Sequence, residues 1–359
     1  MKILIIAFHD REIEPYAVMY EKIAKESDVD YDIFLWDRFS DNSLEIKDNE
    51  YIFHKICTMG GDKLKKIPAF YCFRSVLKKI ITNNCYKKII VLNTMPGVLL
   101  ADLLLNEYKN NFIYDIRDYT YEKYFIYKWL VRKLIANSAF TTISSPGFIK
   151  FLGYSEKFVN NHNISNEADR FAHSTILNKE KIIIGFVGAI RYYEENTALL
   201  DCLKNNDKYS FVYMGRRYPE CDLFTYCQEK KIKNVSFKGA FSNNEKPVIY
   251  RGIDIINAVY GNKKNEVKTA LPNKLYDAII FKKPIMVSSD TYLADVVEKY
   301  RIGFSVDVIR DNFKDKLDKY LQSFNAEEFE HNADSLLEKV MREQNEFKKY
   351  VKETLLKIK

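Results

Sequence analysis

The chain has 359 residues, of which 47% are hydrophobic and 29% charged, with a formal net charge of +7. This balance excludes an intrinsically disordered chain, and the length suits two domains of ordinary size. No apolar run approaches 18 residues, which excludes a membrane-spanning helix, and the six cysteines lack the spacing of a metal site. We expect reduced thiols, no metal site, no cofactor, and a cytoplasmic protein without a signal peptide.

The first half of the chain alternates strand-like and helix-like patterns. Strands are predicted at 2–8, 31–37, 88–93, 111–116, 139–144 and 157–162, with helices at 14–26, 96–108, 121–137 and from Pro146. Alternation of this kind predicts a parallel sheet covered by helices on both faces. No Gly-x-Gly-x-x-Gly motif follows the first strand, which argues against a dinucleotide site there.

A basic segment at residues 54–88 carries nine Lys or Arg residues and a single acid, Asp62, interleaved with apolar side chains. Three interpretations remain open. A basic, aromatic-rich helix is typical of a peripheral membrane surface. It could also attract nucleic acid, or be an ordinary helix whose apolar side lies in the core.

The second half repeats the alternation after a polar, aperiodic linker, which we place at 166–180. Strands are predicted at 181–187, 210–214, 234–238, 253–257, 285–287 and 302–306, with helices at 195–205, 220–231, 245–251 and 274–281. Helices fill 310–359, the last at about 343–359. We expect an α/β protein of two Rossmann-like, doubly wound domains, 1–165 and 181–342, facing a central cleft. The helix at 343–359 is expected to pack back on the first domain.

Four loops that follow strands of the second domain combine glycine with polar residues, and they share one sheet edge because the strands are parallel. Glycine lets a backbone approach a ligand closely, and arginine is suited to phosphate. Ligands of doubly wound sheets bind at the carboxyl ends of strands. These loops therefore predict a site for a phosphate-bearing ligand, and their residues are Gly188 with Arg191, Gly215 with Arg216, Gly239 with Phe241, and Gly261.

The fourth loop leads into a short predicted helix that starts near Pro272 and Asn273. Asn273 is expected to cap this helix, and Lys274 and Asp277 share one of its faces. This pattern is either a capped helix with an ion pair between positions i and i+3, or a site that holds a diphosphate and a sugar hydroxyl. Its position after the other three loops favours the second interpretation.

The order Phe-Val-Gly-x-x-Arg from Phe186, Tyr-x-Gly from Tyr213, Val-x-Phe-x-Gly from Val235, and Leu-Pro-Asn-Lys-Leu-Tyr-Asp from Leu271 resembles the donor-binding half of GT-B glycosyltransferases. The nearest resemblance is to family 4 enzymes of bacterial capsule, O-antigen and lipopolysaccharide assembly. The resemblance implies that donor-binding residues meet the diphosphate, the ribose and the base of a nucleotide sugar. The diphosphate would be bound by Gly188, Arg191 and Lys274, and the helix that carries Lys274 begins at Pro272 and Asn273. The ribose hydroxyls would be hydrogen-bonded by Asp277. The nucleotide would be lined by Gly215, Arg216, Gly239 and Phe241.

The sequence departs from the family pattern at three positions. Asp277 stands where a glutamate is usual, so its reach toward ribose is shorter by one methylene. Thr269 stands where a glutamate often touches the donor sugar, and Glu266 is the nearby substitute. Lys282 stands in place of a glycine before Lys283-Pro284.

The acceptor side is expected in the first domain, at the ends of its strands. Asp118 would bind or orient the acceptor hydroxyl, although an Asp–Arg pair that ties down the strand end is the alternative. Successive side chains of a strand point to opposite faces, so Asp115, Arg117 and Asp118 cannot all three face the cleft. His9 and Asp10 follow the first strand and are also placed on this side, where a lone histidine can equally be structural.

The resemblance implies a glycosyltransferase that moves a sugar from a nucleotide-diphosphate sugar to a saccharide acceptor, expected to be lipid-linked. Arg191, Lys274 and a helix N-terminus could stabilise the leaving diphosphate without a metal, and the family favours retention of configuration. Asp118, Arg191 and Lys274 are the expected catalytic residues. We expect a peripheral protein at the inner face of the cytoplasmic membrane. The alternative is an inactive module that only binds nucleotide sugars, while the lack of an RNA-binding module argues against nucleic acid as a partner.

Overall fold

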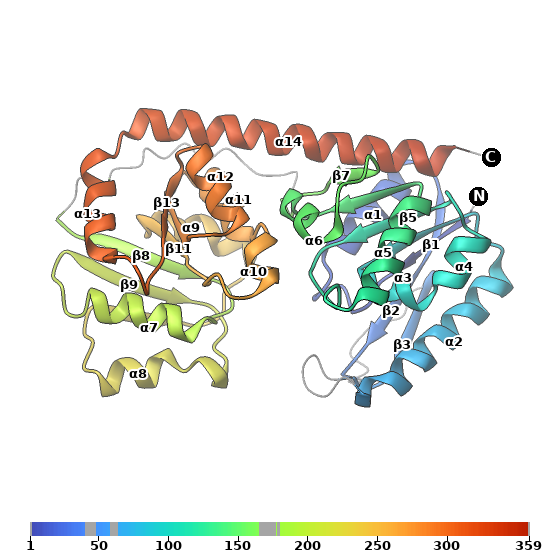
Figure 1. Ribbon diagram of the computed structural model, residues 1–359, viewed down its shortest axis with the longest axis horizontal. Coiled ribbons are helices and arrows are strands. Elements are labelled where there is room, and N and C mark those ends of the chain that lie inside the picture. Colours follow the sequence, from blue (N-terminus) through green and yellow to red (C-terminus); the bar gives the residue numbers. More distant parts are fainter. Residues whose placement is uncertain (1, 40–47, 58–63, 165–176, 178–179, 358–359) are drawn as a thin grey trace. The chain divides into compact units, whose positions relative to one another are not determined.

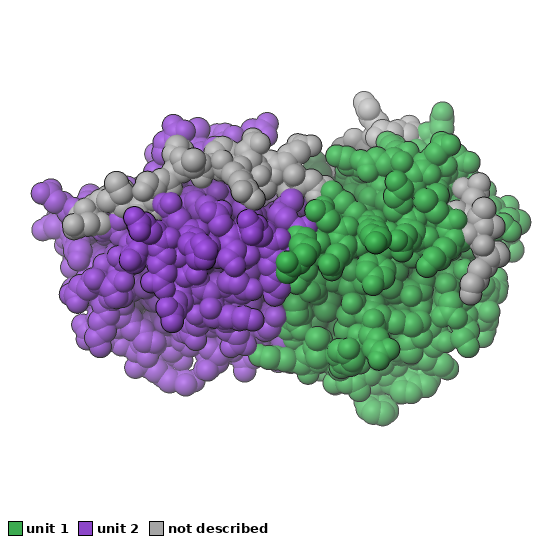
Figure 2. Space-filling model, turned by 90° about the horizontal axis from the view of Figure 1, so that it is seen from above, with its two compact units in different colours: residues 1–162, 342–359 green, residues 163–341 purple. Residues whose placement is uncertain are grey.

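The computed structural model describes residues 2–39, 48–57, 64–164, 177 and 180–357. The chain forms two compact units, which Figure 2 colours separately. Unit 1 comprises residues 1–162 and 342–359, and unit 2 comprises residues 163–341. The predicted linker at 166–180 lies almost entirely outside the described residues.

Unit 1 contains a seven-stranded parallel sheet in the order β3-β2-β1-β4-β5-β6-β7. Its strands (Figure 1) are β1 (Lys2–Ile6), β2 (Asp30–Asp37), β3 (Glu50–His54), β4 (Lys88–Leu92), β5 (Phe112–Ile116), β6 (Phe140–Ile143) and β7 (Phe158–Asn160). The order reverses between β1 and β4. No strand was predicted at β3, because this edge strand is mostly half-buried and its apolar run is only three residues long, Tyr51 to Phe53.

The helices of unit 1 are α1 (Tyr16–Glu26), α2 (Ile67–Asn84), α3 (Thr94–Leu99), α4 (Ala101–Asn106), α5 (Phe125–Asn137) and the short α6 (Ile149–Leu152). The predicted helix at 96–108 is therefore two helices. The basic segment forms α2, whose Phe73 and Leu77 are buried. Its Arg74 and Lys78 both pair with Asp102. The apolar side of this helix lies in the core, and part of its positive charge is neutralised.

Unit 2 contains a six-stranded parallel sheet in the order β10-β9-β8-β11-β12-β13. Its strands are β8 (Ile182–Val187), β9 (Tyr209–Met214), β10 (Val235–Lys238), β11 (Ile255–Ala258), β12 (Ile285–Ser288) and β13 (Gly303–Val306). Its helices before the last are α7 (Tyr193–Cys202), α8 (Leu223–Glu229), α9 (Lys246–Arg251), α10 (Asn265–Thr269), α11 (Asn273–Ile280), α12 (Tyr292–Lys299) and α13 (Phe313–Ser323). The order reverses between β8 and β11, which is where ligands bind in sheets of this kind.

The last helix, α14 (Ala326–Leu356), is one continuous element of 31 residues. The prediction that it begins at about residue 343 was wrong. No glycine or proline interrupts the stretch from 326 to 356, so nothing in the chain ends a helix there. Its last turns pack in unit 1, where Phe347, Val351 and Leu355 are buried in the core around β1 and β2. None of the helices in the described part of the chain is long and apolar enough to cross a membrane.

Candidate functional site

Two glycines hold the strand-end loops of β8 and β9 together in unit 2. Gly188 N donates to Met214 O at 2.8 Å, and Ile190 N donates to Arg216 O at 2.9 Å, so the parallel pairing continues past both strands. Gly215 has a φ of +138°, and a Cβ there would lie 2.1 Å from Gly188 O. A Cβ at Gly188, whose φ is +124°, would meet nothing within 4 Å. The joined loops therefore present an open backbone surface at Gly188.

Arg191 and Arg216 lie on the same aromatic ring. Their guanidinium carbons are 5.0 Å and 5.8 Å from the centre of the Tyr218 ring. Both side chains are exposed, and within the described ranges neither has an ion-pair partner. The structure thus brings together the two arginines that the sequence analysis assigned to a phosphate-bearing ligand.

Helix α11 places Lys274 differently from expectation. The helix begins at Asn273 with Pro272 before it, and no side chain caps it, so the predicted cap by Asn273 was wrong. Lys274 is only 5% exposed. Its Nζ donates to Asn257 O at 2.9 Å and lies 2.9 Å from the centre of the Phe186 ring. Burial lowers the pKa of Lys274 well below its usual range, so a nearby anion would stabilise its charged form.

A buried network of two asparagine amides holds the backbone around Lys274. Asn196 Oδ1 accepts from Asn257 Nδ2 at 3.1 Å and from Tyr213 OH at 3.0 Å. Asn196 Nδ2 donates to Arg191 O at 2.9 Å. The same network therefore fixes the backbone of Arg191 and the carbonyl that holds Lys274. Neither asparagine was found from the sequence, where the only signal is a polar side chain at an otherwise apolar position.

Asp277 is bound to two groups that the sequence analysis did not connect with it. Its Oδ1 and Oδ2 accept from Lys246 Nζ at 2.9 and 3.1 Å, and Oδ2 also accepts from Tyr250 OH at 2.8 Å. The cation that pairs with Asp277 is therefore Lys246, not Lys274 as the i,i+3 interpretation expected. Sequence spacing carries no signal for this pair, because the two residues come from separate helices.

The loop after β10 contains the remaining residues assigned to the donor side. Gly239 is exposed, and a Cβ there would meet nothing within 4 Å. Phe241 is partly buried against the core that contains Tyr250 and Leu271. These positions are compatible with a nucleotide-lining role, which stays a prediction.

Two of the departures from the family pattern have a structural explanation. Thr269 is buried, and its Oγ1 donates to Asn265 O at 2.8 Å, so it offers no carboxylate to a sugar. Lys282 has a φ of +51°, in the left-handed region that glycine adopts more readily than lysine. Lys282 Nζ donates to Asp334 Oδ1 at 2.5 Å on α14.

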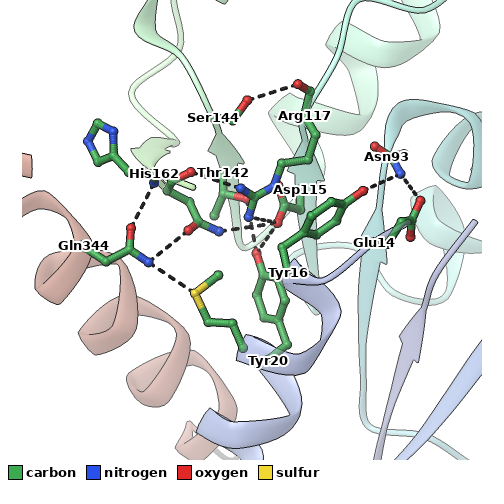
Figure 3. A network of polar contacts seen from close by, with 12 residues as sticks. Glu14, Tyr16, Tyr20, Asn93, Asp115, Arg117, Thr142, Ser144, His162 and Gln344 are labelled. Carbon is green, nitrogen blue, oxygen red and sulfur yellow. Dashed lines mark hydrogen bonds and ion pairs between the residues drawn. The ribbon is translucent and has the colours of Figure 1, made fainter. Parts of the chain in front are cut away.

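In unit 1, Arg117 pairs with Asp115 inside the protein (Figure 3). Arg117 Nε lies 2.8 Å from Asp115 Oδ1, Arg117 Nη2 donates to Asp115 Oδ2 at 2.9 Å, and Tyr20 OH donates to the same carboxylate at 2.7 Å. Asp118 follows β5 by two residues and is exposed. Arg117 is thus a structural residue, and Asp118 alone of the three stays a candidate for contact with an acceptor.

The network around Asp115 continues to residues far along the chain. Arg117 Nη1 donates to Asn161 O at 3.1 Å, and Gln344 Nε2 donates to Asn161 Oδ1 at 3.2 Å. Gln344 Oε1 accepts from His162 N at 2.9 Å (Figure 3). The C-terminal part of α14 is therefore hydrogen-bonded to the end of β7 within unit 1.

His9 is held in one protonation state by Arg38. Arg38 Nη1 lies 3.2 Å from His9 Nε2, and arginine can only donate, so Nε2 accepts. Burial and the charge of Arg38 lower the pKa of His9 to about 3. A neutral imidazole whose Nε2 accepts carries its proton on Nδ1, so neither nitrogen is free to take a proton. His9 therefore does not fit a general base. Asp10 Oδ1 accepts from Glu12 N and Ile13 N and so stabilises the turn after β1.

Glu14 is a buried carboxyl group close to the ends of β1 and β4, between which the strand order reverses. It is 1% exposed, its Oε2 accepts from Phe8 N at 3.0 Å, and its Oε1 accepts from Asn93 Nδ2 (Figure 3). Asn93 has a φ of +72°, which a non-glycine residue rarely adopts. Burial is the main cause that raises the pKa of Glu14 to about 8. Neither residue was found from the sequence.

Glu14 is expected to make stability depend on pH. Its pKa is higher in the folded chain than in the unfolded chain, so the stability it contributes is full below about pH 4.5 and is lost as the pH rises through about 8. Between pH 5 and 9, the free energy of unfolding of the wild type should fall more than that of Glu14→Gln, by at most about 4 kcal/mol. Urea unfolding of both proteins at several pH values measures this difference, and parallel pH profiles would contradict it.

No protein-family model matches the sequence, and no curated protein matches it. The structure is similar to sucrose-phosphate synthase from Thermosynechococcus elongatus, with a TM-score of 0.66 and 13% identity over 99% of this chain and 94% of that one. It is also similar to HepE from Anabaena in complex with UDP, with a TM-score of 0.66 and 12% identity over 97% and 99% of the two chains. A third similar structure is the lipopolysaccharide outer core galactosyltransferase WaaB, with a TM-score of 0.63 and 13% identity over 98% and 100%.

These structures are GT-B glycosyltransferases, and each similarity extends over nearly the whole of both chains. Both units here are doubly wound parallel sheets, of seven and six strands. At 12–13% identity the likeness concerns the fold, and it confirms the fold class predicted from the sequence: the chain has the GT-B fold.

Proposed function

We propose that the chain is a glycosyltransferase that moves a sugar from a nucleotide-diphosphate sugar to a saccharide acceptor in the synthesis of a surface polysaccharide. The observation that carries the proposal is the edge of the unit 2 sheet. There, Arg191 and Arg216 share the Tyr218 ring beside the open backbone of Gly188, and Lys274 lies buried under Phe186. HepE, which shares the fold, has been crystallised with UDP and with UDP-glucose.

The reaction breaks the bond between the anomeric carbon of the sugar and the oxygen of the diphosphate. It forms a bond from that carbon to the acceptor hydroxyl oxygen, and the hydroxyl proton passes to the departing phosphate or to solvent. Negative charge grows on the departing diphosphate, and fixed cations such as Arg191 stabilise it. His9 has no free lone pair on its ring, so we assign it no role as a base. We propose that the reaction retains the anomeric configuration and needs no metal.

The function is tested by thermal shift with UDP, GDP and ADP, followed by transfer assays with sugar donors of the nucleotide that binds. At least one nucleotide diphosphate should raise the melting temperature, because it binds the folded chain only. Release of the nucleotide from its sugar should continue in EDTA. Absence of binding by all three at millimolar concentration would overturn the proposal.

A second candidate is an inactive module that binds a nucleotide sugar. The observation in its favour is Thr269, whose hydroxyl donates to Asn265 O where the related enzymes often have a sugar-binding glutamate. Binding of the nucleotide without release from any donor sugar, with or without an acceptor, would support this candidate over the enzyme.

The acceptor is proposed to be lipid-linked, with the protein at the inner face of the cytoplasmic membrane. Helix α5 exposes Phe125 (81%), Ile126 (77%) and Trp129 (51%). Lys133 Nζ lies 5.1 Å from the centre of the Trp129 ring. Aromatic and aliphatic side chains beside lysine suit an anionic lipid surface. On α2, Ile67 and Tyr71 are also exposed, whereas Lys63 lies outside the described residues.

Replacing Phe125 and Ile126 together with serine is expected to lower binding to vesicles that contain anionic phosphatidylglycerol by at least about tenfold, because burying two large apolar side chains contributes several kcal/mol. Cosedimentation measures this change. A matched control replaces Val248 and Ile309, two exposed apolar residues of unit 2, with serine. Equal binding by both variants and the wild type would contradict membrane attachment through α5.

A further inference from the structure

The carboxylate of Asp277 is already engaged by the protein. A carboxylate offers about four lone-pair positions, and Asp277 uses three of them to accept from Lys246 Nζ, twice, and from Tyr250 OH. Its side chain is 10% exposed, whereas the side chain of Lys246 is 22% exposed. Of the pair, Lys246 is the member that an incoming ligand reaches more easily.

Lys246 occupies a defined place between two parts of the candidate nucleotide site. It is the first residue of α9, and the capping box of Ser242 and Glu245 fixes the turn before it. The loop just upstream carries Gly239 and Phe241. On the other side Lys246 binds Asp277 of α11, one turn after Lys274. Its ammonium group is therefore next to the residues assigned to the ribose.

Side-chain length also favours Lys246 over Asp277 as the residue that reaches a ligand. An aspartate side chain has a single methylene and reaches only a short distance from its backbone. Lysine extends a four-carbon stem and carries three N–H donors. Two contacts to Asp277 leave the Lys246 ammonium with a further donor, and ribose hydroxyl oxygens accept hydrogen bonds.

We propose that Lys246, rather than Asp277, meets the ribose hydroxyls of the donor nucleotide, and that Asp277 and Tyr250 position its ammonium group. This assignment rests on the proposed function, since it requires a nucleotide at the unit 2 site. Lys246 is then the residue that distinguishes ribonucleotides from deoxyribonucleotides, and Asp277 acts on the ligand only through it.

The test is a double-mutant cycle in which one change removes the Lys246 ammonium group from the protein and the other removes a ribose hydroxyl from the ligand. Calorimetry measures the dissociation constants of the best-binding nucleotide diphosphate and of its 2′-deoxy and 3′-deoxy forms, for the wild type and for Lys246→Met. The wild type should bind at least one deoxy form about tenfold more weakly. Lys246→Met should bind the ribonucleotide about tenfold more weakly than the wild type does. In this variant, removing the ribose hydroxyl from the ligand should weaken binding by less than about threefold.

Lys208→Met is the matched control, because it removes another lysine of unit 2 that pairs with an aspartate, Asp318, and it lies just before β9, at the opposite end of that strand from the Gly215 loop. It should retain the wild-type preference for the ribonucleotide. Lys246→Met leaves Asp277 without its cation, so thermal unfolding without nucleotide is measured for every variant. Lys246→Gln keeps a donor for Asp277 but ends short of the lysine ammonium, and it should fold and also lose the preference.

Two results would overturn the assignment while leaving the proposed function intact. One is a wild type that binds the ribonucleotide and both deoxy forms equally well. The other is a wild-type preference that persists in Lys246→Met and Lys246→Gln. Failure of the wild type to bind any nucleotide diphosphate is a different result, because it refutes the proposed function itself and the ribose assignment with it.

Discussion

Arg191→Ala is expected to lower kcat/KM for sugar transfer by about 10²- to 10³-fold, the usual loss when one fixed group that stabilises transition-state charge is removed. The guanidinium of Arg191 lies over Tyr218, and its backbone carbonyl is held by Asn196. The backbone of Arg191 is therefore held in place, and the Tyr218 ring favours one position of its guanidinium before a substrate arrives. Steady-state kinetics with the sugar donor measure the effect, and most of it should be in kcat because the charge develops during the reaction.

The matched control for this variant is Arg301→Ala, which removes an exposed arginine of unit 2 that pairs with Glu328 on the surface. Surface pairs of this kind contribute little to stability, so this variant should keep wild-type kinetics. Both variants should also keep the wild-type melting temperature within a few degrees. Activity of Arg191→Ala within threefold of the wild type would remove Arg191 from the catalytic site.

Asp115→Asn is expected to lower the free energy of unfolding by about 3–5 kcal/mol, the usual cost of removing one partner from a buried ion pair. Asp115 and Arg117 are both buried. Arginine stays protonated in proteins. Burial by itself would lower the pKa of Arg117, but the charge of Asp115 and the other groups around it outweigh burial and raise the pKa above its usual value. The variant therefore leaves a buried charge without a counter-charge. Urea unfolding followed by circular dichroism measures the loss.

A double variant, Asp115→Leu with Arg117→Met, separates the charge from the packing. Replacing a buried ion pair with apolar side chains of similar volume is often close to neutral. The double variant should therefore recover more than half of the stability that Asp115→Asn loses. A loss below about 1 kcal/mol for the single variant, as expected for an exposed pair, would show that the charge of Arg117 is satisfied without Asp115.

The alternation of strands and helices could be predicted because it depends on the spacing of apolar residues within each short segment. Strands such as Lys88–Leu92 and Phe112–Ile116 are buried on both faces and therefore appear as continuous apolar runs. The edge strand Glu50–His54 has a run of only three apolar residues, is mostly half-buried, and was missed. The start of the long helix Ala326–Leu356 was also missed, although its apolar residues recur at helical spacing from Phe329 through Ala333, Leu336 and Val340.

Part of the candidate site could be predicted for a topological reason. Parallel strands end at the same sheet edge, so the glycines and arginines after β8 and β9 had to lie near each other. The structure adds what holds them there: the contact between Gly188 and Gly215, and the Tyr218 ring. Asn196 and Asn257 could not be assigned, because a buried amide is chosen by its hydrogen-bond partners, which come from other elements.

The sequence by itself determined the fold class, the strand-end loops and the types of residue available to bind a phosphate, because those depend on periodicity and on neighbours along the chain. Only the tertiary structure decided the pairing of these residues. Asp277 pairs with Lys246, 31 positions away, and Gln344 bonds to Asn161, 183 positions away. Such pairs form between elements that the parallel topology brings together, and no spacing along the chain encodes which cation will reach a buried carboxylate.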